Sequence, residues 1–333
     1  MLSRLFPVLS RITLTLVFLV ILAGAVVRTT GSGMGCPDWP KCFGQYIPPT
    51  ELSQLPADYK VRFMVKGKEI ADFDAFKTWT EYINRLLGAL LGVVIFALCI
   101  SSLTFRRTNK TNIVLSLLLL VVTGFVGWLG SVVVKTDLEP VKITIHMLTA
   151  FVILALAVTM VHRANVSLPS EGRVKPSLLL PSWVAPLLLV SLAITLAQVM
   201  LGTQVREEID TIAKTLEYRW RELWVQQLSS MFVVHRTASW LVLLLNGFII
   251  WKIFQTTQTI ASEYKVLRRA AGIIAAGIVV EIALGVTLAY FAMPKAAQPA
   301  HLLGASIIFA AQLYCSLEVF ALRRSQSLSQ SHP

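Results

Sequence analysis

Eight apolar runs constrain this chain more than any other feature of its sequence. Each run is long enough to cross the hydrocarbon core of a bilayer, which takes about 20 helical residues. The approximate spans are 11–27, 82–104, 112–134, 143–162, 183–203, 231–251, 269–291 and 299–321. The sequence therefore predicts an all-α integral membrane protein with eight transmembrane helices.

The composition agrees with a membrane protein. Of the 333 residues, 55% are hydrophobic and 14% are charged, whereas about 25% of a soluble domain is charged. A net charge of +12 would suit nucleic acid, but the basic residues are scattered among apolar runs and follow membrane topology instead. We therefore expect a lipid bilayer and no nucleic acid. The first span has no convincing signal-peptide cleavage site, so we interpret it as a retained helix.

The loop charges predict the orientation of the helices. Lys and Arg outnumber Asp and Glu at both termini and in the short loops after the second, fourth and sixth spans. A basic excess in short loops marks the cytoplasmic side. Both termini are thus expected inside, in a cell inner membrane, with the long segments 28–80 and 204–230 outside.

The chain also reads as an internal repeat of two halves. Four spans lie in residues 1–164 and four in 183–333, with a linker at 165–182 between them. Similar residues recur at matching places in the two halves. They are Gly24 and Arg28 with Gly202 and Arg206, Asn84 and Arg85 with His235 and Arg236, and Gly130 and His146 with Gly285 and His301. The repeat predicts two tandem, pseudo-symmetric four-helix bundles, each with a polar cluster at its outer end.

The histidines of the second half indicate a haem site. His235 and His301 begin neighbouring even-numbered spans, and two imidazoles that face each other in an apolar bundle suit axial ligation of haem iron. Arg236 and Arg206 are then expected at the haem propionates, because a guanidinium binds both oxygens of a carboxylate. The alternative for each histidine is a hydrogen bond between helices, but the pairing across the repeat favours ligation.

The first half differs at one ligand position. It has His146, but Asn84 stands where the second half has His235, and an amide is a poor iron ligand. We therefore expect an open or weakly held iron position and the reactive site in this half. Glu81 lies three residues before Asn84, on the same helical face. Its carboxyl group would move protons or stabilise a developing cation; alternatively it is an interfacial acid at a helix N-terminus.

Two other arrangements of polar residues lie within the predicted spans. His146 and His162 lie about 24 Å apart along one helix, which would suit two stacked haems, but no partner ligand is apparent near the inner face. Glu281 lies well inside the seventh span, and the matching residue of the first half is Val126. A carboxyl group within the membrane is a functional candidate by default, yet its role stays unassigned.

The first outer segment contains a cysteine pair. Cys36 and Cys42 lie in the Gly- and Pro-containing stretch "GMGCPDWPKCFGQ". On the outer side such a pair is expected to form a disulfide, either structural or redox-active. A metal site is less favoured, because two thiols without histidine are too few ligands.

These stretches resemble the haem A synthase family. The similar segments are "GAVVRTTGSGMGCPDWPKCFG", "TEYINRLLG", "GSVVVKTDLEPVKITIHM", "FVVHRTASW" and "QPAHLLGA". The resemblance implies an enzyme that oxidises the C8 methyl group of haem O to a formyl group by successive hydroxylations, giving haem A for terminal oxidases. It implies a haem b cofactor between His235 and His301, a substrate haem in the first half, a functional glutamate at Glu81, and a cysteine pair at Cys36 and Cys42.

The sequence departs from the family pattern at Asn84, where many relatives have histidine in a Glu-x-x-His-Arg pattern. We accordingly assign Glu81 to the reaction, His146, Asn84 and Arg28 to the substrate-haem site, and Arg85 to a propionate. The expected partners are haem O synthase and an unidentified electron donor, and a homo-oligomer is left open. Two alternatives remain at this point: a membrane b-type cytochrome that relays electrons, and a haem transporter.

Overall fold

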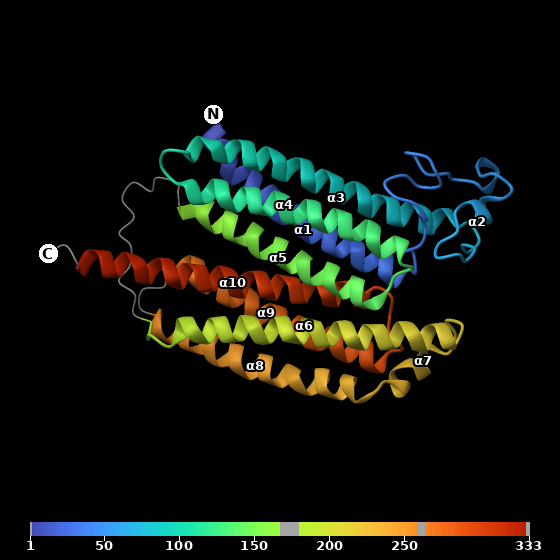
Figure 1. Ribbon diagram of the computed structural model, residues 1–333. Coiled ribbons are helices and arrows are strands. Elements are labelled where there is room, and N and C mark those ends of the chain that lie inside the picture. Colours follow the sequence, from blue (N-terminus) through green and yellow to red (C-terminus); the bar gives the residue numbers. More distant parts are fainter. Residues whose placement is uncertain (1, 167–179, 259–263, 331–333) are drawn as a thin grey trace. The chain divides into compact units, whose positions relative to one another are not determined.

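The computed structural model describes residues 2–166, 180–258 and 264–330. In this part of the chain, eight long helices are apolar enough to cross a membrane, and no strand is present. The helices are α1 (Leu2–Thr29), α3 (Ala75–Ser102), α4 (Lys110–Lys135), α5 (Pro140–Val166), α6 (Val184–Thr215), α8 (Ser230–Thr256), α9 (Lys265–Tyr290) and α10 (Ala297–Gln330) (Figure 1). Each helix overlaps one predicted span, so the predicted all-α membrane fold with eight transmembrane helices is confirmed.

Large apolar side chains on the helix surfaces fit a lipid environment. Val93, Val121, Leu244 and Val279 each expose more than half of their surface. Such exposure would be costly in water, whereas hydrocarbon tails are as apolar as these side chains. The chain is therefore a multi-pass membrane protein.

Two N-cap residues determine where the site-bearing helices begin. The side chain of Asp74 accepts a hydrogen bond from the backbone N–H of Lys77 at the start of α3. The hydroxyl group of Ser229 likewise accepts one from Met231 at the start of α8. Such caps satisfy backbone donors that have no partner within the helix. They place Glu81 and His235 in the early turns of their helices.

The chain divides into two compact units, Met1–Ala164 and Asn165–Pro333. Most of the predicted linker 165–182 lies outside the described residues. In the first unit α3 packs against both α1 and α4. The segment between α1 and α3 contains η1 (Leu52–Gln54) and α2 (Tyr59–Arg62) and lies beyond the end of α1 and the start of α3 (Figure 1). We call residues 30–74 the outer segment.

The second unit contains a closed ring of helix contacts. Helix α6 packs against α8, α8 against α9, α9 against α10, and α10 against α6. This ring is a four-helix bundle, and its core includes Leu188, Ile253, Ile274 and Cys315. The pseudo-symmetry between the two units stays a prediction.

One predicted loop is partly helical. Residues 204–230 were expected to be an outer loop, but α6 continues to Thr215 and α7 occupies Arg221–Trp224. The continuation carries Ile209 and Ala213 on one face, and both are buried against Trp224 and Met293. Apolar residues at helical spacing thus extend the helix past the point where the hydropathy falls.

Candidate functional site

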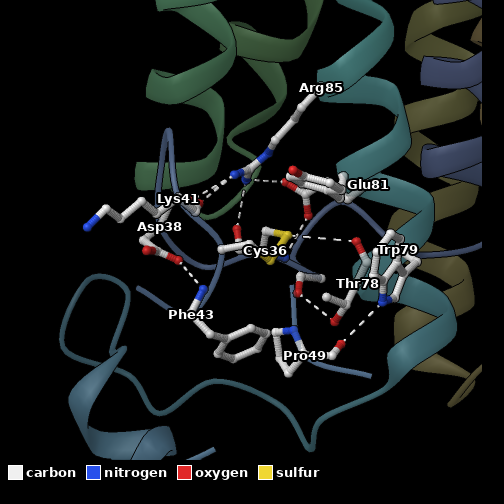
Figure 2. The surroundings of a disulfide bond; sticks show 12 residues. Cys36, Asp38, Lys41, Phe43, Pro49, Thr78, Trp79, Glu81 and Arg85 are labelled. Atoms are coloured by element: carbon white, nitrogen blue, oxygen red, sulfur yellow. Dashed lines mark hydrogen bonds and ion pairs between the residues drawn. A yellow bond between two sulfur atoms is a disulfide. The ribbon is translucent and has the colours of Figure 1, made fainter. Parts of the chain in front are cut away.

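The carboxylate of Glu81 is buried and fully engaged. Only 4% of the residue's surface is exposed. Its Oε2 accepts a hydrogen bond from the backbone N–H of Cys36 at 2.9 Å, and its Oε1 accepts one from Nη2 of Arg85 at 2.5 Å (Figure 2). A buried carboxylate needs such partners, because an unpaired one is strongly destabilising. The outer segment therefore helps to hold Glu81 in one position on α3.

Arg85 joins the outer segment to α3. Its Nη1 donates to the backbone oxygens of Asp38 and Lys41 at 2.7 and 3.0 Å, and its Nη2 donates to that of Cys36 at 2.9 Å as well as to Glu81 (Figure 2). Both terminal nitrogens are thus engaged with protein. The propionate contact expected for Arg85 stays a prediction, while the described contacts give this residue a role in anchoring the outer segment.

The predicted disulfide is confirmed. Cys36 and Cys42 are bonded to each other and fully buried. The carboxylate of Asp38, which lies between them, accepts hydrogen bonds from the backbone N–H groups of Phe43 and Gly44 at 2.6 and 2.8 Å. These bonds close a small loop whose carbonyl groups face Arg85.

The outer segment lies directly on the backbone of α3. A Cβ atom at Gly35 would overlap the backbone of Lys77 and Thr78, so only glycine permits this approach. The hydroxyl group of Thr78 donates to the carbonyl oxygen of Gly35 at 2.9 Å. This contact explains why the N–H of the next residue, Cys36, reaches Glu81.

The two ligand candidates of the first unit each face a glycine on a neighbouring helix. A Cβ at Gly24 of α1 would lie 3.9 Å from Oδ1 of Asn84, and one at Gly130 of α4 would lie 3.5 Å from Cε1 of His146. Oδ1 of Asn84 and Nδ1 of His146 are buried without a hydrogen-bond partner. Asn84 lies one turn from Glu81, as its spacing predicts.

The second unit repeats this arrangement with two histidines. A Cβ at Gly202 of α6 would lie 3.1 Å from Cε1 of His235, and one at Gly285 of α9 would lie 3.8 Å from Cε1 of His301. Gln198 donates a hydrogen bond to the backbone oxygen of His235 at 2.7 Å. Each of these two histidines thus lies beside a glycine of a neighbouring helix, and their pairing as axial ligands stays a prediction.

The contacting glycines are site residues that sequence reasoning missed. They served only as landmarks of the repeat, although the equal spacing from Gly130 to His146 and from Gly285 to His301 was a usable signal. A glycine leaves room for the flat edge of an imidazole against the neighbouring helix. A larger residue at these positions would limit where the ring can lie.

The donor set fits haem better than a bare metal ion. Nδ1 of both His146 and His235 is buried, so Nε2 is the nitrogen available for ligation. Among the described residues, no group of three or more His, Cys, Asp or Glu side chains is placed to hold a metal ion. Haem iron needs only axial ligands from the protein, because the porphyrin supplies the others. The residues present therefore fit haem groups.

The remaining predicted arginines have various surroundings. Arg206 forms an ion pair with Asp210 at 2.7 Å and a hydrogen bond to Gln298. Arg236 is exposed on α8, with its guanidinium over the ring of Phe232 at 5.6 Å. Arg28 lies half-buried at the end of α1. Their expected contacts with propionates stay predictions.

Fold and site together define a polytopic helical membrane protein with buried polar side chains in the early turns of its helices. Comparison with known proteins agrees with this class. Residues 8–313 match the COX15-CtaA family, described as cytochrome oxidase assembly protein, and the chain belongs to that family.

Several relatives carry the name Heme A synthase. The Shewanella oneidensis protein is 32% identical over 194 residues, which cover 58% of this chain and 54% of the relative. The Rhodospirillum centenum protein is 24% identical over 81% of this chain and 76% of its own length. The Nitrosomonas eutropha protein is 24% identical over 90% of this chain and 89% of its own length. The matching segment thus spans about half of the first relative and most of the other two.

Proposed function

We propose that this chain is a haem A synthase, which oxidises the C8 methyl group of haem O to a formyl group for the assembly of terminal oxidases. The observation that carries the proposal is the match of residues 8–313 to the family, whose relatives are named for this activity. The geometry supports it, because a buried carboxylate lies one turn from an incomplete ligand pair.

The reaction needs an oxidant and an electron donor. With dioxygen, each hydroxylation takes two electrons and two protons from outside, places one oxygen atom on the carbon and releases the other as water. A second hydroxylation of the same carbon gives a geminal diol, which loses water to leave the formyl group. The chain must therefore bind haem O, deliver protons and receive electrons.

In the first unit, His146 is assigned to the iron of the substrate haem. Asn84 would hold that iron weakly or not at all, because an amide oxygen is a poor ligand. Glu81 is the group that gives or takes protons. Its position depends on Cys36 and Arg85, which bind its two oxygens.

In the second unit, His235 and His301 would hold the iron of a haem b, which would supply one-electron chemistry when bound. Arg206 and Arg236 are assigned to propionates on charge and position. The two units thus divide the work, with substrate turnover in one and electron handling in the other.

We place the protein in a cell inner membrane with both termini in the cytoplasm and the haem sites toward the outer side. The basic short loops support this orientation. The Cys36–Cys42 disulfide lies next to Glu81, and disulfides persist on the oxidising side of a membrane. The proposed partners are haem O synthase and an electron donor.

Haem extraction tests the proposal. The chain is expressed with and without a haem O synthase, in a host that makes no haem A, and the extracted haems are separated by chromatography. We expect haem A only when haem O is supplied. Haem b alone in both cases, with folded protein and a supplied donor, would refute the synthase and favour a b-type cytochrome. Bound haem O that moves without oxidation would indicate a transporter.

A further inference from the structure

Glu281 is a carboxylate within a membrane-spanning helix and has no part in the function proposed so far. It lies on α9, and the matching residue of the first half is the apolar Val126. Its side chain is only 14% exposed. A carboxylate at such a depth is costly unless a specific partner faces it. The second unit therefore contains a polar group that the repeat does not account for.

The partner of Glu281 is the histidine assigned to haem iron on the next helix. Oε2 of Glu281 lies 2.9 Å from Nδ1 of His301 on α10. The two atoms are close enough for a hydrogen bond, but the Nδ1–H bond of the ring as it lies is not aligned with the carboxylate. The carboxylate thus faces the ring nitrogen opposite to Nε2.

A gap in the side chains of α10 accommodates this carboxylate. Gly304 lies one turn after His301 on the same helix. A Cβ atom at Gly304 would overlap Oε1 of Glu281 and would lie 3.1 Å from its carboxyl carbon. The carboxylate can reach His301 only because residue 304 has no side chain. Two separate features, the short contact and the glycine, therefore indicate a built pair.

Among the described contacts of the three histidines assigned to haem iron, only that of His301 involves a carboxylate. Nδ1 of His235 and Nδ1 of His146 are buried without a hydrogen-bond partner. The carboxylate therefore distinguishes one axial ligand of the second unit from its opposite ligand and from the ligand of the first unit.

We propose that Glu281 is a positioning residue for the axial ligand His301 and lowers the reduction potential of the haem that His301 binds. An imidazole that binds iron through Nε2 carries its proton on Nδ1. A small rotation of the imidazole would let that N–H donate to the carboxylate 2.9 Å away, which would fix the ring and make Nε2 a stronger donor. A stronger donor and a nearby negative charge both favour ferric over ferrous iron.

The inference rests on the proposed haem b site and gives that site a direction of electron flow. A lower potential makes the reduced haem b a stronger electron donor. The carboxylate thereby favours electron transfer from the haem of the second unit to the oxidation reaction, as a synthase requires.

The test is a redox titration of the purified full-length protein with its bound haem. Optical and electron paramagnetic resonance spectra report the oxidation state of the iron. The variants are Glu281→Gln, which keeps the shape and removes the charge, and Glu281→Asp, which keeps the charge. Glu222→Gln is the matched control, because Glu222 is an exposed carboxylate of the same unit, on α7. We expect Glu281→Gln to shift the ferric–ferrous equilibrium toward ferrous by about tenfold, which is about 59 mV for one electron. Glu281→Asp should shift it less, and Glu222→Gln should not change it.

The outcomes separate this inference from the proposed function. A wild-type protein with bis-histidine haem and an unchanged potential in Glu281→Gln overturns the inference and leaves the synthase intact. Should Glu281→Gln fail to hold haem, Gly304→Ala, which displaces the carboxylate, replaces it. A raised potential in Gly304→Ala supports the inference, and an unchanged potential overturns it. Wild-type protein without haem bound by His301 overturns both the inference and the haem b assignment.

Discussion

Replacing Gly202 by alanine is the sharpest test of the contact between helices and haem ligands. The added Cβ would lie 3.1 Å from Cε1 of His235 and 3.7 Å from both ring nitrogens. Carbon atoms prefer separations of about 3.5–4.0 Å. The imidazole must therefore move by a few tenths of an ångström, away from the position that the wild-type helix pair gives it.

The expected size of the effect follows from this overlap. Overpacking of this kind costs about 1–3 kcal/mol. If the cost falls on the haem-bound form, where the ring is least free to move, haem affinity falls tenfold for each 1.4 kcal/mol. Gly202→Ala should therefore weaken haem b binding by about 5-fold to about 140-fold, with the helices intact.

The assay measures the loss of haem from the purified protein to an excess of a haem scavenger. The change in haem absorption reports this loss. The matched control is Gly285→Ala, because its Cβ would lie 3.8 Å from Cε1 of His301, an ordinary contact distance. This control should keep haem nearly as well as the wild type. Equal haem loss from the two variants, or wild-type behaviour of Gly202→Ala, would show that these glycines do not position the ligands. Circular dichroism and size-exclusion chromatography verify that both variants are folded.

Three further predictions concern the first unit. Glu81→Gln should lower haem A formation by about 100-fold or more, the usual size of a general acid–base contribution, and leave the haem b spectrum unchanged; haem extraction measures both, and normal haem A formation would remove Glu81 from the mechanism. Replacing Cys36 and Cys42 together by alanine removes a loop constraint of about 2 kcal/mol, so limited proteolysis should cut the outer segment faster while the helices persist; unchanged cleavage would contradict a stabilising role. In the outer segment, Asp72 pairs with Lys60 at 2.6 Å, and this hydrogen bond and the opposite charge lower the pKa of Asp72 and raise that of Lys60. The pair therefore stabilises the segment at neutral pH, and the contribution is lost as pH falls through the lowered pKa or rises through the raised one. Hydrogen exchange should show faster exchange in Asp72→Asn than in the wild type at neutral pH but not in strong acid; a difference that persists in acid would rule out this ion pair as its cause.

The eight helices could be predicted because membrane insertion is governed by local apolarity. A span needs about 20 apolar residues in sequence, so a window of residues contains nearly all of the information. The disulfide was predictable for the same reason, since Cys36 and Cys42 are close in sequence and lie in a segment that can turn back. The helical continuation of α6 to Thr215 was missed because its stability comes from packing against Trp224 and Met293, which hydropathy does not report.

The partners of the charged site residues depend on folding and were less accessible. Nothing local shows that Arg85 binds three carbonyl groups of the outer segment, because those groups become neighbours only when the segment folds onto α3. The same holds for Glu281. Its position in the sequence showed that it lies within a span, but its contact with His301 depends on how α9 and α10 face each other.

The glycines that face the ligand positions change how substitutions in such a chain should be interpreted. A replacement of Gly202 by alanine or leucine preserves or raises the apolarity of its helix, so a hydropathy scan would classify it as silent. The structure indicates the opposite, because the vacant volume beside His235 is the feature that matters. In helices of this kind, the residue with the least chemistry of its own can be the one that least tolerates replacement. A search for disabling variants should therefore begin at Gly202 as well as at His235, which it faces.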